Sequence, residues 1–256
     1  VEESLGGSAT FFSASASFFC PVRVVAVVGK DFDSDLLDFI RNRGVDFSGV
    51  YTEDGETFRW GARYHKDINQ RETLYTHLNV FQTFKPHIPE KFKESKFVFL
   101  ANIDPDLQKD VLGQVDNPEF VMMDTMNFWI GGKRESLVNV LGNVNGIILN
   151  DEEVRQLSGE LNLVKAIKRV SEFGPELIIV KKGEHGAVMY SGGEFFFIPA
   201  YPVEDVLDPT GAGDSFAGGF MGYIANLENL NFTGLKKGLV YATVVSSFCV
   251  ERFGIE

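Results

Sequence analysis

Residues 207–220, LDPTGAGDSFAGGF, place glycines and an aspartate at the start of a predicted helix. An apolar stripe that includes Phe216 and Ile224 indicates the helix, and apolar strand patterns precede it. Glycine weakens a helix interior by about 1 kcal/mol relative to alanine, so helix stability does not explain Gly211 and Gly213. Without a Cβ, these residues would let an anion approach the free N–H groups at the helix N-terminus.

A carboxylate follows the two glycines. Asp214 would lie beside such an anion without donating a hydrogen bond to it. Phosphoryl transfer uses this combination, because backbone donors hold the charge on the transferred group while a carboxylate takes the proton of the attacking hydroxyl. On the pattern alone, a glycine-rich turn whose aspartate only favours the helix dipole is the simpler interpretation.

The composition is that of a globular protein with a sizeable core. Of the 256 residues, 44% are hydrophobic and 23% are charged. The net charge of −12 argues against general affinity for nucleic acid or an anionic membrane. No apolar run reaches the roughly 18 residues of a membrane span. Cys20 and Cys249 form neither a disulfide framework nor a metal-ligand motif, so we expect a reducing, cytoplasmic location.

Short apolar runs alternate with helical patterns along the chain. Their near-continuous Val, Ile, Leu and Phe content suits strands buried on both faces of a parallel sheet. The alternation predicts an α/β fold with a doubly wound, mainly parallel sheet flanked by helices. The predicted strands are 22–29, 97–102, 120–124, 146–150 and 177–183, and the predicted helices are 33–44, 104–115, 134–144 and 162–174.

One region within residues 51–82 departs from this alternation. Residues 57–65 and 72–80 are rich in aromatic and β-branched side chains and predict an antiparallel hairpin with a turn at 67–70. We predict a small antiparallel β lid over a ligand, and an edge hairpin without a binding role is the alternative. Arg59 and Arg63 share one strand face, where they would clamp a substrate phosphate or, more commonly, be solvated charges.

Four motifs in order resemble those of the ribokinase-like, or PfkB-type, carbohydrate kinases. DPTGAGD resembles the family signature, and the paired glycines of LGGSATFFSASASFF resemble the start of its sugar-side helix. The other two matches are VVGKDFDSDLLDFIRNRGVDFSGV (27–50) and NDEEVRQLSG (150–159), the latter followed by VKKGEHGAVMY (180–190). The match implies a single ribokinase-like domain over residues 1–256, with a first strand that would precede Val1.

The resemblance implies an ATP-dependent kinase that phosphorylates a hydroxymethyl group of a sugar or nucleoside. It makes Asp214 the catalytic base and the backbone of Gly211, Ala212, Gly213 and Asp214 the anion hole. It further implies that Asn150 and Glu153 bind Mg²⁺ and phosphate through water, that Gly183 and Gly186 admit the nucleotide, and that Asp208 and the Thr210 carbonyl hold K⁺. Apart from the resemblance, Lys181 and Lys182 end a buried strand, where one of them would contact a phosphate or both would be solvated charges.

On the acceptor side, the resemblance assigns the substrate to Gly6 and Gly7. Phe11 stands where many members have an asparagine that bonds sugar hydroxyls. A phenylalanine can stack on a ring but cannot accept a hydrogen bond, which favours nucleosides over plain sugars. We also expect a homodimer formed through the lid.

Other functions remain open. A non-catalytic nucleotide or sugar sensor would keep this fold, and a sugar-phosphate kinase would keep its chemistry. Asp214 favours an enzyme, because a sensor needs no base beside an anion hole. A Rossmann-type dehydrogenase is excluded, because the early strand lacks the glycine fingerprint that should follow it.

Overall fold

The computed structural model describes residues 4–64 and 71–255. Its main sheet has six strands in the order β10-β9-β8-β7-β6-β5. The four strands from β5 to β8 are parallel, and β9 and β10 complete the sheet as antiparallel neighbours. The strands are β5 (Phe97–Leu100), β6 (Phe120–Asp124), β7 (Gly146–Asn150), β8 (Leu177–Lys181), β9 (Ala187–Ser191) and β10 (Glu194–Ile198).

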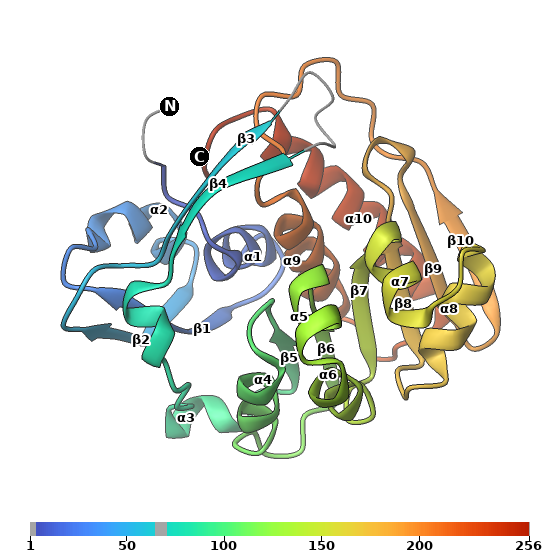
Figure 1. The fold of residues 1–256 in the computed structure, drawn as a ribbon, viewed down its shortest axis with the longest axis horizontal. Helices are drawn as coiled ribbons and strands as arrows, with labels where there is room; N and C mark the ends of the chain where they lie inside the picture. Colours follow the sequence, from blue (N-terminus) through green and yellow to red (C-terminus); the bar gives the residue numbers. More distant parts are fainter. Residues whose placement is uncertain (1–3, 65–70, 256) are drawn as a thin grey trace.

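Helices cover both faces of this sheet and make it the middle of three layers (Figure 1). One apolar core lies between the sheet and the helices that connect its parallel strands along the chain. The other lies between the opposite face of the sheet and the C-terminal helices. The first set is α4 (Pro105–Leu112), α5 (Asn127–Gly132), α6 (Arg134–Leu141), α7 (Asp151–Ser158) and α8 (Leu163–Ser171), and the second is α9 (Ala212–Ile224) and α10 (Phe232–Val250). The predicted doubly wound α/β fold is therefore confirmed.

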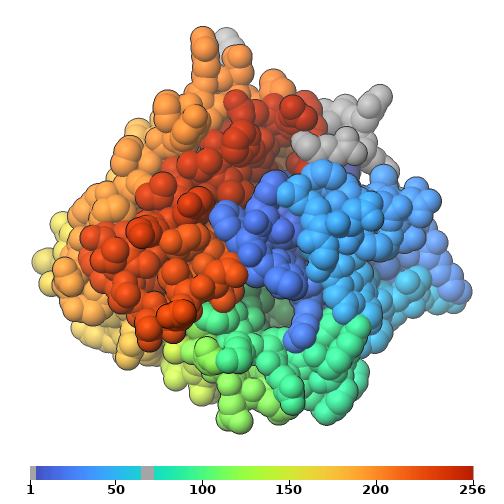
Figure 2. All heavy atoms as spheres, turned by 180° about the vertical axis from the view of Figure 1, so that it is seen from behind, coloured from blue at the N-terminus to red at the C-terminus, as the bar shows by residue number. Residues whose placement is uncertain are grey.

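The N-terminal helix α1 (Ser8–Ala16) packs along α9. A Cβ on Gly218 would lie 2.3 Å from the carbonyl oxygen of Phe12, so the two backbones approach each other as closely as glycine permits. The ring of Phe12 also stacks on Phe99 of β5, with ring centroids 4.5 Å apart. Figure 2 shows the N-terminal segment lying against the C-terminal helices. This packing brings the two glycine-containing helix starts together.

The strand predicted at 22–29 lies elsewhere than expected. It forms β1 (Val22–Gly29), which pairs in parallel with β2 (Val45–Glu53) in a separate two-stranded sheet. Several of its residues are only partly buried, because its core is a small cluster with α1 and α2 (Asp38–Arg41). An apolar run alone does not distinguish such a strand from one in the main sheet.

A second two-stranded sheet contains β3 (Arg59–Tyr64) and β4 (Arg71–His77), which pair antiparallel as predicted. The predicted turn at 67–70 and residue 65, the end of the first predicted strand, lie outside the described residues. In Figure 1 the two strands run from the β1–β2 side toward the loop that precedes α9. The short remaining elements are η1 (Ser34–Leu37), η2 (Asn79–Thr83), α3 (Glu90–Lys93) and η3 (Gly183–His185).

Candidate active site

The carboxyl ends of three neighbouring strands bring polar side chains to one edge of the main sheet. Asp124, Asn150 and Lys181 are the last residues of β6, β7 and β8, and Asn150 pairs directly with Lys181 in the strand register. Ligands of open α/β sheets bind at this edge. Two buried oxygens, Oγ1 of Thr125 after β6 and Oδ1 of Asn102 after β5, have no hydrogen-bond partner among the described residues. Unpartnered buried polar atoms at this edge are consistent with a ligand site.

The start of α9 completes this edge. Gly211 is its N-cap with φ of 80°, and the first hydrogen bond of the helix runs from Ser215 N–H to the Gly211 carbonyl. The N–H groups of Gly213 and Asp214 therefore precede the hydrogen-bonded helix and are the donors available to an anion. The N–H of Ala212 already donates to the Pro209 carbonyl at 3.2 Å. The predicted anion hole therefore has fewer free N–H donors than its four residues suggest.

Asp214 is a carboxylate in an unfavourable environment for its charge. Burial and the neighbouring Asp124 raise the pKa of Asp214 to about 6, although Lys181 and a hydrogen bond from Ser8 act in the opposite direction. Ser8 begins α1 immediately after the predicted substrate glycines Gly6 and Gly7. The structure thus brings the predicted base to the predicted acceptor side. A carboxylate with a pKa near neutrality is suited to accept a proton there.

Glu153 and Asn150 cap α7 with each other. The Asn150 side chain accepts the Glu153 N–H, and the Glu153 carboxylate accepts the Asn150 N–H, both at 2.8 Å. This capping box accounts for their spacing without a metal. Glu153 is nevertheless buried, and burial together with Asp124 raises its pKa to about 7. Two buried carboxylates that repel each other are a favourable donor set for a divalent cation.

The described residues contain no cluster of three His, Cys, Asp or Glu that would form a protein-only metal centre. Mg²⁺ commonly binds with one or two carboxylates, waters and substrate phosphates, so Asp124 and Glu153 fit it. Burial also raises the pKa of Asp124, with Lys181 opposing the shift. Sequence analysis did not identify Asp124, because only the fold brings its charge near those of Glu153 and Lys181.

Phe11 lies under the anion site. A Cβ on Gly211 would lie 2.4 Å from the ring atoms of Phe11, and only 4% of the Phe11 surface is exposed. The ring has little free area on which a substrate could stack. The structure therefore gives no support to the stacking role predicted from the sequence.

The remaining predicted residues have partners within the chain. Arg59 is ion-paired with Asp31 at 3.1 Å, close to the base of the hairpin. Gly183 opens the turn after β8, where Gly186 passes so close to Ile198 that a Cβ would lie 1.9 Å from its carbonyl oxygen. This close approach explains Gly186 without a nucleotide.

The proposed potassium ligands also have partners. Oδ1 of Asp208 accepts the Thr210 N–H at 2.9 Å, and the Thr210 carbonyl accepts the Cys249 thiol at 3.4 Å. These contacts give no support to a cation at this position. Both cysteines are free thiols.

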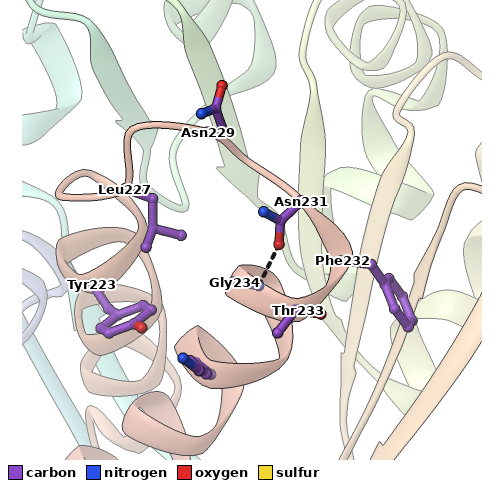
Figure 3. A pocket seen from close by; sticks show the side chains of 8 residues that line it. Tyr223, Leu227, Asn229, Asn231, Phe232, Thr233 and Gly234 are labelled. Atoms are coloured by element: carbon purple, nitrogen blue, oxygen red, sulfur yellow. Dashed lines mark hydrogen bonds between the residues drawn. The ribbon is translucent and has the colours of Figure 1, made fainter.

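A hollow of about 510 Å³ lies elsewhere, at the junction of α9 and α10 (Figure 3). Tyr223 and Leu227 lie on one side, and the start of α10 lies on the other, where Asn231 accepts the Gly234 N–H at 2.9 Å. Its lining includes none of the residues at the sheet edge. We therefore take the carboxyl ends of β6 to β8 and the start of α9 as the candidate active site.

The model of the pfkB family carbohydrate kinases matches residues 1–256. The chain belongs to this family. Its members are phosphotransferases, so the protein is a kinase by family. Among curated relatives, it is 29% identical over 223 residues to the cytidine kinase of Thermococcus kodakarensis, covering 84% of this chain and 78% of the relative. It is 27% identical to the nucleoside kinase of Methanocaldococcus jannaschii, covering 91% and 74%.

Solved structures share the fold of this pfkB-family kinase. A protein of Escherichia coli provisionally described as ribokinase II, solved with ATP and Mg²⁺, superposes with a TM-score of 0.82 at 23% identity, covering 100% of this chain and 85% of the other. The Methanocaldococcus jannaschii nucleoside kinase superposes with a TM-score of 0.77 at 23% identity, covering 99% and 82%. No helix among the described residues is long and apolar enough to cross a membrane.

Proposed function

We propose that this kinase transfers the γ-phosphoryl group of ATP to a hydroxymethyl group of a nucleoside or sugar, with Asp214 as the base. The main support is the position of Asp214 at the start of α9. There its carboxylate accepts a hydrogen bond from Ser8 and lies next to the free backbone N–H groups. The acceptor oxygen attacks the γ-phosphorus, the bond to the β–γ bridging oxygen breaks, and the hydroxyl proton passes to Asp214. ADP leaves with the bridging oxygen.

The residues at the carboxyl ends of the strands and at the start of α9 each have a role in this reaction. The N–H groups of Gly213 and Asp214 hold the oxygens of the transferred group. Asp124 and Glu153 would hold Mg²⁺ through its water shell. Bound there, Mg²⁺ would offset the negative charge of the nucleotide phosphates. Asn150 fixes the Glu153 carboxylate through the capping box.

The acceptor class is proposed from relatives rather than from Phe11. The cytidine kinase and the nucleoside kinase named above suggest a nucleoside, and a ribokinase of Lactococcus lactis, 26% identical over 239 residues, keeps sugars open. The sugar-phosphate alternative rested on Arg59 and Arg63 as a phosphate clamp, and Arg59 is ion-paired with Asp31.

The test is a panel of nucleosides, sugars and sugar phosphates incubated with ATP and Mg²⁺, with ADP and phosphorylated product both measured. In Asp214→Asn we expect turnover to fall about 10²–10⁴-fold while ATP affinity stays nearly unchanged, the usual effect of removing a positioned base. ATP binding without phosphorylation of any acceptor would favour the sensor. Near-normal turnover of Asp214→Asn would require a different base.

We also propose that the β3–β4 hairpin is a lid through which two copies associate. Residues 72–77 of β4 are exposed, with Leu74 and Tyr75 at 50% and 44% exposure, and Leu78 follows at 43%. An exposed apolar strand is a ready pairing surface. Light scattering of the protein and of Leu74→Asp would test this, since a monomer at micromolar concentration in the unaltered protein would contradict it.

A further inference from the structure

Lys181, at the end of β8, extends beneath the first turn of α9. A Cβ on Gly213 would lie only 2.7 Å from the Lys181 Nζ atom. The ammonium group therefore lies beside the backbone whose N–H groups form the anion site. A side chain at position 213 would require the Lys181 ammonium group to move.

This placement is electrostatically unfavourable in isolation. A helix N-terminus carries roughly half a positive charge, so a second cation beside it is repelled. The Lys181 side chain makes no direct ion pair or hydrogen bond with residues 4–64 and 71–255, although protein atoms surround its ammonium group. A surrounded cation without a direct partner is costly unless something else binds it.

Three carboxylates nevertheless keep Lys181 charged. Burial lowers the pKa of Lys181, but Asp124, Glu153 and Asp214 together raise it above its usual value. These groups act at a distance rather than by contact. The residue as a whole is only partly buried. The protein therefore holds a charged lysine amine beside the N–H groups of Gly213 and Asp214, where both can donate hydrogen bonds to an anion.

We propose that Lys181 contacts the oxygens of the phosphoryl group during its transfer and the β–γ bridging oxygen, which stays on ADP after the transfer. The proposal rests on the proposed kinase function. As the bond between the γ-phosphorus and the bridging oxygen breaks, negative charge shifts toward that oxygen and stays on the equatorial oxygens. A lysine supplies a compact positive charge for such oxygens. The Lys181 ammonium and the Gly213 N–H would bind the same group.

A purely structural counter-ion for the three acids is the competing interpretation. The two differ in their dependence on the ligand. A lysine that contacts the terminal phosphates affects ADP and ATP more than AMP, which lacks these phosphates. A structural counter-ion affects all nucleotides alike, or only the stability of the protein.

The experiment measures ADP and AMP affinity by calorimetry with Mg²⁺ present, and steady-state kinetics with the best acceptor. The variants are Lys181→Met, Lys181→Arg, and Lys168→Met as a control that removes an exposed lysine from α8. For Lys181→Met we expect ADP affinity to fall at least 10-fold, AMP affinity to stay within 2-fold, and kcat to fall at least 100-fold. Lys181→Arg should recover part of the ADP affinity, because it keeps the charge in a different geometry.

Equal losses of ADP and AMP affinity in Lys181→Met, or unchanged kcat, would overturn the role of Lys181. The same holds if Lys182→Met shows the selective loss instead. If Lys181→Met does not fold, Lys181→Arg decides, because unchanged ADP affinity and kcat in that variant contradict a geometric contact. Failure of the unaltered protein to phosphorylate any acceptor refutes the kinase proposal itself, while the ADP and AMP comparison still reports on Lys181.

Discussion

The hydroxyl of Tyr64, the last residue of β3, lies 3.0 Å from Oγ1 of Thr210 in the loop before α9. Thr210 is four residues from the proposed base Asp214, and its N–H and carbonyl are held by Asp208 and Cys249. One hydrogen bond thus joins the hairpin to the loop that shapes the anion site. Through this hydrogen bond, movement of the proposed lid would affect the loop before α9.

Removing this hydroxyl should weaken the connection. A neutral hydrogen bond contributes about 0.5–1.5 kcal/mol, so we expect Tyr64→Phe to raise the acceptor KM about 2- to 10-fold with a smaller change in kcat. Tyr51→Phe is the matched control, because Tyr51 donates to the His87 carbonyl at 2.9 Å and not to this loop. Steady-state kinetics of both variants decide the matter. Equal effects in the two variants would contradict a specific role for the Tyr64 contact.

The pH dependence of the reaction should report the base. The pKa of Asp214 is raised to about 6 by burial and by Asp124, and a base acts only when ionised. We therefore expect kcat/KM to rise with pH through an apparent pKa near 6 and to level off above about 7. Rates measured from pH 5 to 9 with subsaturating acceptor would show this. A profile that is flat from pH 5 to 8 is incompatible with Asp214 as the titrating base.

The same carboxylate should make the protein less stable at neutral pH. The folded pKa of about 6 lies above the ordinary value of 3.8, so the folded state keeps a proton that the unfolded chain releases. The free energy of unfolding therefore falls as pH rises from about 4 to about 6. Asp214→Asn should gain about 1–2 kcal/mol at pH 8, allowing for partial exposure. Urea unfolding at pH 4.5 and pH 8 measures the difference, which should shrink in the variant.

The Mg²⁺ concentration needed for half-maximal rate should depend on Glu153 but not on its neighbour Glu152. Glu153 is buried beside the Asp124 charge, whereas Glu152 on the same turn is exposed. Glu153→Gln keeps an acceptor for the Asn150 N–H but loses its charge, so we expect the Mg²⁺ concentration for half-maximal rate to rise about 10-fold. Glu152→Gln should leave it unchanged. An unaltered Mg²⁺ requirement in Glu153→Gln would reduce Glu153 to its capping role.

The sequence predicted those parts of the fold that continuous apolar runs determine. Residues 120–124 and 146–150 form β6 and β7 with the predicted bounds, because a strand buried on both faces has no polar interruption. The placement of β1 outside the main sheet was not predictable, since its composition is equally apolar. Asp124 was missed for a different reason. Its role depends on the neighbouring positions of β6, β7 and β8 in the sheet, which bring residues far apart in the chain together and leave no local motif.

Substitution of Phe11 distinguishes a packing role from a substrate contact, because the two roles predict different changes in stability and kinetics. Its ring lies directly under Gly211 and is 4% exposed, so Phe11→Leu should leave a partly filled space below the anion site. Changes of this kind in a packed core cost roughly 1–3 kcal/mol. We expect Phe11→Leu to lower the midpoint of urea unfolding and to lower kcat for nucleosides and sugars by the same factor.

Phe18 provides the matched control, because it is 60% exposed and carried on the same N-terminal segment. Phe18→Leu should change neither stability nor kinetics appreciably. If Phe11 instead stacked on a nucleobase, Phe11→Leu would raise the nucleoside KM while leaving that of a plain sugar alone, since a stacked aromatic pair contributes about 0.5–1.5 kcal/mol beyond its buried area. A selective loss of nucleosides in Phe11→Leu would therefore place the ring in the acceptor site and contradict its assignment as a packing residue.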